Sequence, residues 1–243
     1  VEYGNDHDRR AVISFPMMKG VYRTARPFDY GEGTDATWFS NVKLPTSVMV
    51  MRGQSHMDFL GGYDFAANAG TLTVADPHIS VGKKMWTWGD GDFGRAWCAN
   101  LTDNGDRYIE LMTGVYTDNQ PDFTYIQPGE TKVFTQVWYP IRGIGEVVNA
   151  TRDAALSLKL EGDAARVGAM TTSDCPGARL TLTVKGTLVW EQRADLSPAS
   201  FLAESVSLPA GVDPHDLRLA LCDASGRELA AYAPVRHGEK EPP

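Results

Sequence analysis

The sequence has few cysteines, little positive charge and no long apolar run, and each shortage excludes a class of protein. Three widely spaced cysteines, Cys98, Cys175 and Cys222, predict neither a disulfide framework nor a zinc site. The sequence contains 23 Lys and Arg residues and 31 Asp and Glu residues, a formal net charge of −8. This excess of acidic residues argues against nucleic-acid binding, because binding to phosphates requires clustered cations. No run reaches the ~20 apolar residues of a transmembrane helix, and no signal peptide is recognisable. We therefore expect a cytoplasmic protein without a membrane or nucleic-acid partner.

The motifs that usually hold cofactors are also missing. The sequence contains no nucleophile elbow, no phosphate loop and no dinucleotide fingerprint. Its five histidines lack the spacing of a metal site, and the acidic run near residue 90 does not fit a calcium loop. We therefore expect no cofactor and no metal.

Strand patterns dominate what is present. Apolar and polar residues alternate at 71–74, 107–113 and 133–138, whereas repeats at three and four residues are scarce. Asn104-Gly105 is a strong hairpin signal, which predicts a turn between a strand near 95–101 and the strand at 107–113. The fold class predicted from these patterns is all-β.

The composition changes near residue 150 and divides the chain. Residues 1–148 hold five of the six tryptophans, and residues 149–236 hold only Trp190. The second region instead alternates leucines with polar residues, which predicts a small immunoglobulin-like β-sandwich. Residues 237–243 are polar and predict a linker or tail. The leucines of the predicted strands are Leu156, Leu158, Leu160, Leu180, Leu182, Leu217, Leu219 and Leu221.

Glu110 is the first candidate for chemistry. It lies between Tyr108 and Met112 on one face of a predicted strand, while Ile109 and Leu111 face the interior. A partly desolvated carboxylate beside aromatic side chains can serve as a general acid or base. The alternative is a solvated strand glutamate paired with a neighbouring Lys or Arg.

The run from Met85 to Trp97 is the second candidate. If it is a strand, Trp86 and Trp88 share a face and offer a stacking surface for a pyranose ring, and Asp90 and Asp92 can bond its hydroxyls. The alternative is a pair of core tryptophans followed by a Gly-Asp-Gly turn.

A loop of carboxylates, amides and aromatics at 116–123 is the third candidate. Such a group suits the recognition of several hydroxyls, although Asn, Asp and Pro also fill turns for backbone reasons. Asp122 or Asp118 would be the carboxylate partner of Glu110. The further candidate ligand contacts are Tyr116, Asn119, Gln120 and, nearer the start of the chain, Trp38 and Asn41.

The order of these segments resembles a known signature. Glu110, then Pro121-Asp122, then Pro128-Gly129-Glu130, then Trp138-Tyr139 resembles the region around the catalytic glutamate of galactose mutarotase-like proteins. Together with 34–41 and 84–97, the layout is similar to a bacterial domain family of uncharacterised function. Its members combine a mutarotase-like β-supersandwich, a small β-sandwich and tetratricopeptide repeats.

The resemblance implies a carbohydrate-active domain. A supersandwich takes ~270 residues, so 1–148 would be its second half, and an upstream region or a second chain would complete the sheet. The chain begins with Val1 rather than Met, which agrees with further residues upstream. A His-Pro-Tyr-Phe-like motif is missing, so glycosidase-like chemistry with Glu110 and Asp122 is favoured over aldose 1-epimerisation.

Three functions remain open from the sequence. The first is an enzyme acting on an oligosaccharide or monosaccharide, with Glu110 as the acid or base. The second is a non-catalytic carbohydrate-binding module that uses the aromatic residues. The third is a protein-interaction scaffold that presents partners to downstream repeats.

Overall fold

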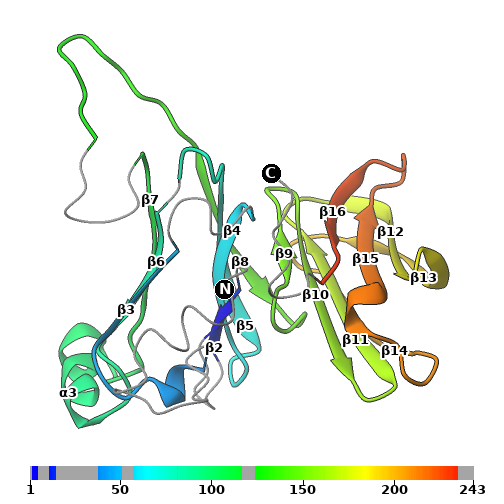
Figure 1. Cartoon of the computed structure of the whole chain (residues 1–243), viewed down its shortest axis with the longest axis horizontal. Coiled ribbons are helices and arrows are strands. Elements are labelled where there is room, and N and C mark those ends of the chain that lie inside the picture. The colour runs from blue at the N-terminus through cyan, green and yellow to red at the C-terminus, as the bar shows by residue number, and fades with distance from the viewer. Residues whose placement is uncertain are drawn as a thin grey trace. The chain divides into compact units, whose positions relative to one another are not determined.

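The computed structural model describes residues 2–4, 11–14, 38–50, 57–80, 82–116 and 124–234 (Figure 1). The predicted all-β class is confirmed, because strands dominate and α3 is the single α-helix in these ranges. The chain divides into two compact units, the first comprising Val1–Ala67 and Leu72–Trp138 and the second Asn68–Thr71 and Tyr139–Pro243.

The first eight strands form three sheets. Their orders are β1-β2, β3-β6-β7 and β4-β5-β8. The elements are β1 (Glu2–Gly4), β2 (Ala11–Ser14), η1 (Phe39–Asn41), β3 (Thr46–Val50), β4 (Phe59–Asp64), β5 (Ala69–Ala75), β6 (Gly82–Thr87), α3 (Asp92–Leu101), β7 (Glu110–Gly114) and β8 (Gln136–Arg142).

In the β3-β6-β7 sheet, β6 alternates between buried and half-buried residues, whereas all five residues of β7 are half-buried. In β6, Lys83, Met85 and Thr87 are buried, whereas the residues between them are half-buried. Met85 pairs with Leu111 of β7, and antiparallel partners share a face. A Cβ placed on Gly62 of β4 would lie 3.6 Å from Leu111 Cδ1. The face that carries Met85 and Leu111 therefore looks toward β4, although Leu111, which the sequence predicted to face the interior, is only half-buried.

The strand predicted at 95–101 is wrong, because this segment belongs to α3. Residues 92–101 contain no β-branched side chain, so helix formation costs little rotamer freedom. Gly94 and Cys98, four residues apart, are the buried positions of the helix, which is the spacing of one helical face. Asn104-Gly105 consequently leads from a helix into β7 rather than joining two strands of a hairpin.

Two glycines allow α3 to pack tightly on the segment before it. Gly89 has φ +84°, a left-handed conformation, and a Cβ there would lie 2.7 Å from the carbonyl oxygen of Leu44. A Cβ on Gly94 would lie 1.8 Å from the carbonyl oxygen of Gly89. Only glycine fits at either position, because the obstructing atoms are backbone.

Gly94→Ala is therefore expected to destabilise the first unit although alanine favours helices. The methyl group must displace the backbone at Gly89, and overpacking of this kind costs ~1–3 kcal/mol or more. Urea unfolding followed by tryptophan fluorescence measures the loss. Ala96→Gly in the same helix is the control, and its smaller loss of ~1 kcal/mol reflects propensity alone. A Gly94→Ala variant as stable as the parent would contradict the packing described.

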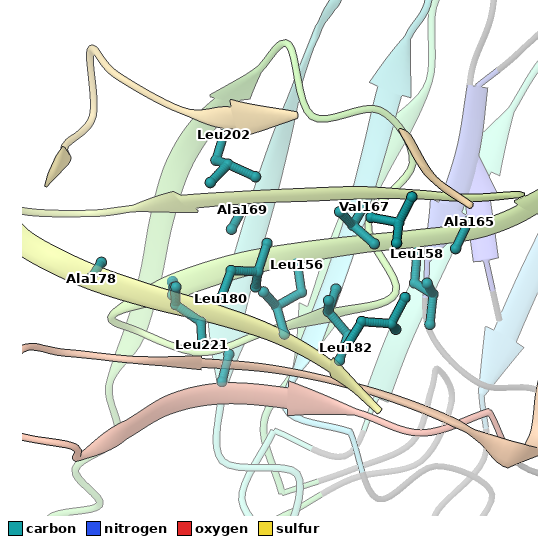
Figure 2. Packing of buried hydrophobic residues seen from close by; sticks show 14 of the residues in the cluster. Leu156, Leu158, Ala165, Val167, Ala169, Ala178, Leu180, Leu182, Leu202 and Leu221 are labelled. Carbon is teal, nitrogen blue, oxygen red and sulfur yellow. The ribbon is translucent and has the colours of Figure 1, made fainter. Parts of the chain in front are cut away.

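The second unit contains two four-stranded sheets, with orders β14-β11-β10-β9 and β13-β12-β15-β16. Figure 2 shows the leucines and small residues that fill the space between them. Leu156, Leu180, Leu182, Leu219 and Leu221 are fully buried, which confirms the inward face predicted for these leucines, although Ser157 on the opposite face of β10 is buried as well. The elements are β9 (Asn149–Ala150), β10 (Ala154–Glu161), β11 (Ala164–Thr171), β12 (Cys175–Val184), β13 (Thr187–Leu196), β14 (Leu202–Ser207), η2 (Pro214–Asp216), β15 (Leu217–Cys222) and β16 (Glu228–Tyr232).

Candidate functional site

One face of the β3-β6-β7 sheet carries the predicted carboxylate. Glu110 is the cross-strand partner of Trp86, and Met112 is the partner of Lys84. All four side chains are half-buried and lie on the face opposite Met85 and Leu111. We call these four residues, together with Tyr108, the Glu110 face.

Tyr108 and Glu110 form a hydrogen-bonded pair on this face. The Tyr108 hydroxyl donates to Glu110 Oε1 at 3.0 Å. Partial burial raises the pKa of Tyr108, and the hydrogen bond and charge of Glu110 raise that pKa further. The phenol therefore keeps its proton at neutral pH and remains a donor to the carboxylate.

The second oxygen of Glu110 makes no hydrogen bond within the described residues, and no Lys or Arg there forms an ion pair with this carboxylate. The alternative of a strand glutamate neutralised by a neighbouring cation is therefore not what these residues form. The arrangement leaves Oε2 to accept a hydroxyl or to transfer a proton.

Trp86 lies beside Glu110 with a cation close to its ring. Lys84 Nζ is 5.9 Å from the ring centroid, a contact worth ~0.5–1 kcal/mol at an exposed site. The indole Nε1 is shielded from solvent and has no acceptor in the part of the chain that is described. The ring thus adds an apolar surface to a face that otherwise carries charge.

The strand ends around this face are tied together by polar contacts. Thr87 Oγ1 donates to the carbonyl oxygen of Tyr108 at 3.0 Å and accepts from the Gly89 amide at 3.0 Å. Next to Tyr108, Arg107 Nε lies 2.6 Å from Asp90 Oδ1. These contacts fix the approach to β7 against the end of β6, and so position Tyr108 beside Glu110.

Asp90 and Asp92, both predicted ligand contacts, are engaged by cations. Asp90 is only 13% exposed and, besides Arg107, has Lys43 at 3.3 Å and Arg95 at 3.9 Å. Asp92 is fully exposed in the first turn of α3 and pairs with Arg95 at 3.0 Å. A carboxylate in the first helical turn also interacts favourably with the helix dipole.

Trp88 does not continue the strand of Trp86, because β6 ends at Thr87. Its ring instead stacks on Trp97 of α3, with centroids 4.6 Å apart and planes 11° apart, and Phe93 packs edge-on against it. Sequence reasoning did not identify Phe93 and Trp97 as partners of Trp88. The signal was their four-residue spacing, which places them on one face of a helix.

Tyr116, Trp38 and Asn41 lie in other contacts. Tyr116 has φ +64°, and its ring contacts Lys132 Nζ at 5.0 Å. The Trp38 ring is 6.2 Å from that of Phe65, and Asn41 donates its amide to the Trp38 carbonyl in η1. None of these contacts reaches the Glu110 face. The predicted residues Asp118, Asn119, Gln120 and Asp122 lie outside the described residues.

Residues 15–141 match the model of a domain of unknown function, DUF5107, which covers more than half of the chain. The chain belongs to the DUF5107 family. Residues 149–232 match the second domain of YphG-like proteins, so the Glu110 face lies in the DUF5107 region and the sandwich of Figure 2 lies in the second match. These matches confirm the predicted membership of a domain family of uncharacterised function. The likeness to mutarotases and the downstream repeats stay predictions.

Over the ranges that the structure describes, no group of three or more His, Cys, Asp or Glu is placed to hold a metal ion. No helix in these ranges is long and apolar enough to cross a membrane.

The opposite face of the same sheet in the DUF5107 region contains a buried amine. Lys83 is 2% exposed and donates to the carbonyl oxygen of Met57. Burial lowers the pKa of Lys83 to about 8, an effect that the nearby charge of Asp58 only partly opposes. Burial likewise raises the pKa of Asp58, and Lys83 opposes that shift. The alternation of β6 places Lys83 inward, a position that lysine side chains rarely occupy.

Lys83 predicts that the DUF5107 region gains stability between pH 8 and pH 10. Above its folded pKa of about 8, the unfolded chain still binds the proton, so the free energy of unfolding rises with pH. The full effect is about 3 kcal/mol, since one pKa unit is ~1.4 kcal/mol. Urea unfolding at several pH values measures it in the parent and in Lys83→Met, which should lose the rise.

Lys84→Met, the neighbour on the other face, is the control and should keep the pH dependence. If Lys83→Met and Lys84→Met show the same slope, the Lys83 amine is not buried as described.

Proposed function

We propose that the DUF5107 region binds and acts on an oligosaccharide at the Glu110 face, with Glu110 as the acid or base. The observation that carries the proposal is the placement of a carboxylate without an ion-pair partner in the described residues between an indole and a phenol. An aromatic ring and a charged acceptor on one face suit a sugar, whose ring has apolar C–H surfaces and polar hydroxyls.

The three side chains would have separate roles. Trp86 would stack on a pyranose ring, and Tyr108 would hold Glu110 Oε1 so that Oε2 points to the ligand. Glu110 would then accept a hydroxyl proton or deliver a proton to a glycosidic oxygen. In such chemistry a second carboxylate ~5 Å away implies retention, and one ~6.5–9.5 Å away implies inversion. Asp122 or Asp118 would supply it.

A relationship to mutarotase-like supersandwiches is part of the same proposal. What supports it is the order of Glu110 at the start of β7, the Pro128-Gly129-Glu130 turn and Trp138 in β8. Glu130 Oε2 accepts a hydrogen bond from the Gln127 backbone amide at 2.7 Å, and Gly129 has φ +81°. The turn is therefore stabilised by contacts among its own residues. An upstream region and downstream repeats would complete the protein.

A non-catalytic sugar-binding module is the second candidate. Asp90, the other predicted hydroxyl contact close to this sheet, is held by three cations. Among the five described residues of the Glu110 face, Glu110 is the only carboxylate. Binding requires no second carboxylate, whereas most glycoside hydrolases use two.

Binding and product release from a panel of oligosaccharides test the proposal. Trp86→Ala is expected to weaken binding about tenfold, or ~1.4 kcal/mol. Glu110→Gln should bind with similar affinity and lose ~10²–10⁴ in rate, the contribution of a general acid or base. Calorimetry and chromatography of released sugars measure the two effects, and circular dichroism checks folding.

Glu204→Gln is the matched control, an exposed strand glutamate of the second unit, and should behave as the parent. Unchanged release by Glu110→Gln would overturn the acid–base role. Binding without release by the parent would support the module instead. Neither binding nor release across the panel would overturn both candidates.

A further inference from the structure

The sheet β13-β12-β15-β16 of the second unit has a long unpaired edge. β13 lies at its end and spans Thr187–Leu196, and no strand among the described residues pairs with its outer side. Most of its residues are exposed, including Leu188 and Val189. An unpaired edge presents backbone donors and acceptors to any strand that can align with it.

The β16 and β14 edges of the second unit are less suited to pairing. On the β16 side, Asn149 Nδ2 donates to the Ala231 carbonyl, and Thr151 Oγ1 donates to the Leu229 carbonyl. In the other sheet, β14 is shorter and carries a single charged residue, Glu204. β13 combines length with charges of both signs, namely Glu191, Arg193 and Asp195.

One charge on β13 lacks a partner. Glu191 is the cross-strand neighbour of Thr181, and Arg193 is the neighbour of Arg179. Arg179 pairs with Glu191 at 3.4 Å, whereas Arg193 forms no ion pair with any residue that the structure describes. Like charges directly opposite one another are unfavourable, so Arg193 would gain from a carboxylate on its other side.

The regular part of β13 has a centre that suits two-fold pairing. Its register with β12 is irregular between Cys175 and Ala178 and again between Leu182 and Thr183. Between these points, residues 190–194 of β13 pair one to one with 178–182. The middle of this run is Gln192, with Glu191 on one side and Arg193 on the other.

We propose that β13 pairs antiparallel with β13 of a second copy of this chain, about a two-fold axis at Gln192. This register places Glu191 of each copy opposite Arg193 of the other, and it places Trp190 opposite Ala194. The unpaired arginine on each copy thereby gains a carboxylate, twice per dimer. The two sheets become one continuous sheet, and the interface is self-complementary as two-fold symmetry requires. This dimer does not depend on the function of Glu110.

Charge exchange tests the register. Sedimentation equilibrium of the parent over a range of concentrations should show a monomer–dimer equilibrium that weakens with salt. Glu191→Arg and Arg193→Glu each place like charges opposite one another, and each should raise the dissociation constant by roughly tenfold or more. The double variant Glu191→Arg/Arg193→Glu restores opposite charges and should return to the parent value.

Mixing the two single variants gives the most discriminating test of the register. One copy then carries arginine at both positions and the other carries glutamate at both. The heterodimer should therefore form at protein concentrations at which neither variant alone dimerises. Circular dichroism of each variant guards against misfolding, and Glu204→Arg on β14 is the control that should leave dimerisation unchanged. A monomeric parent, or single variants that dimerise like the parent, would overturn the proposal.

Discussion

The ion-pair cluster around Asp90 is the constraint on which the described part of the DUF5107 region depends. One nearly buried carboxylate joins Arg107 before β7, Lys43 after η1 and Arg95 in α3. Lys43 and Arg95 are half-exposed, so each pair alone stabilises little, and the cluster matters because one carboxylate joins three separate segments of the chain. These ion pairs hold together the end of β6, the approach to β7 and the start of α3. The position of the Glu110 face depends on these three segments.

Strand alternation in β6 and β7 places the residues that pack in the interior on one face and the candidate catalytic residues on the other. Lys83 and Met85 of β6 are buried and share a face with the half-buried Leu111, whereas Trp86 and Glu110 lie one residue out of phase on the other face. A slip of one residue would exchange the two sets. The buried amine of Lys83 is the polar exception on the inner face. It donates a hydrogen bond to the Met57 carbonyl oxygen and interacts electrostatically with Asp58 instead of with solvent.

Local pattern was enough to predict several features. The alternation at 107–113 predicted a strand, which the structure places at Glu110–Gly114, and the leucine repeats predicted the core of the second unit. The helix α3 was missed because it is short and carries the aromatic residues that also favour strands. The partners of Trp88 and Asp90 were missed because they come from a helix and from separate segments, and such contacts depend on tertiary structure rather than on neighbouring residues.

The stack of Trp88 on Trp97 joins the segment after β6 to the helix that follows it. Two indoles at this separation and nearly parallel couple their electronic transitions, so the pair has an optical signature that isolated tryptophans lack. Because one ring belongs to the segment after β6 and the other to α3, the coupling vanishes as soon as the helix leaves its place. The chain therefore carries its own spectroscopic reporter for the docking of α3.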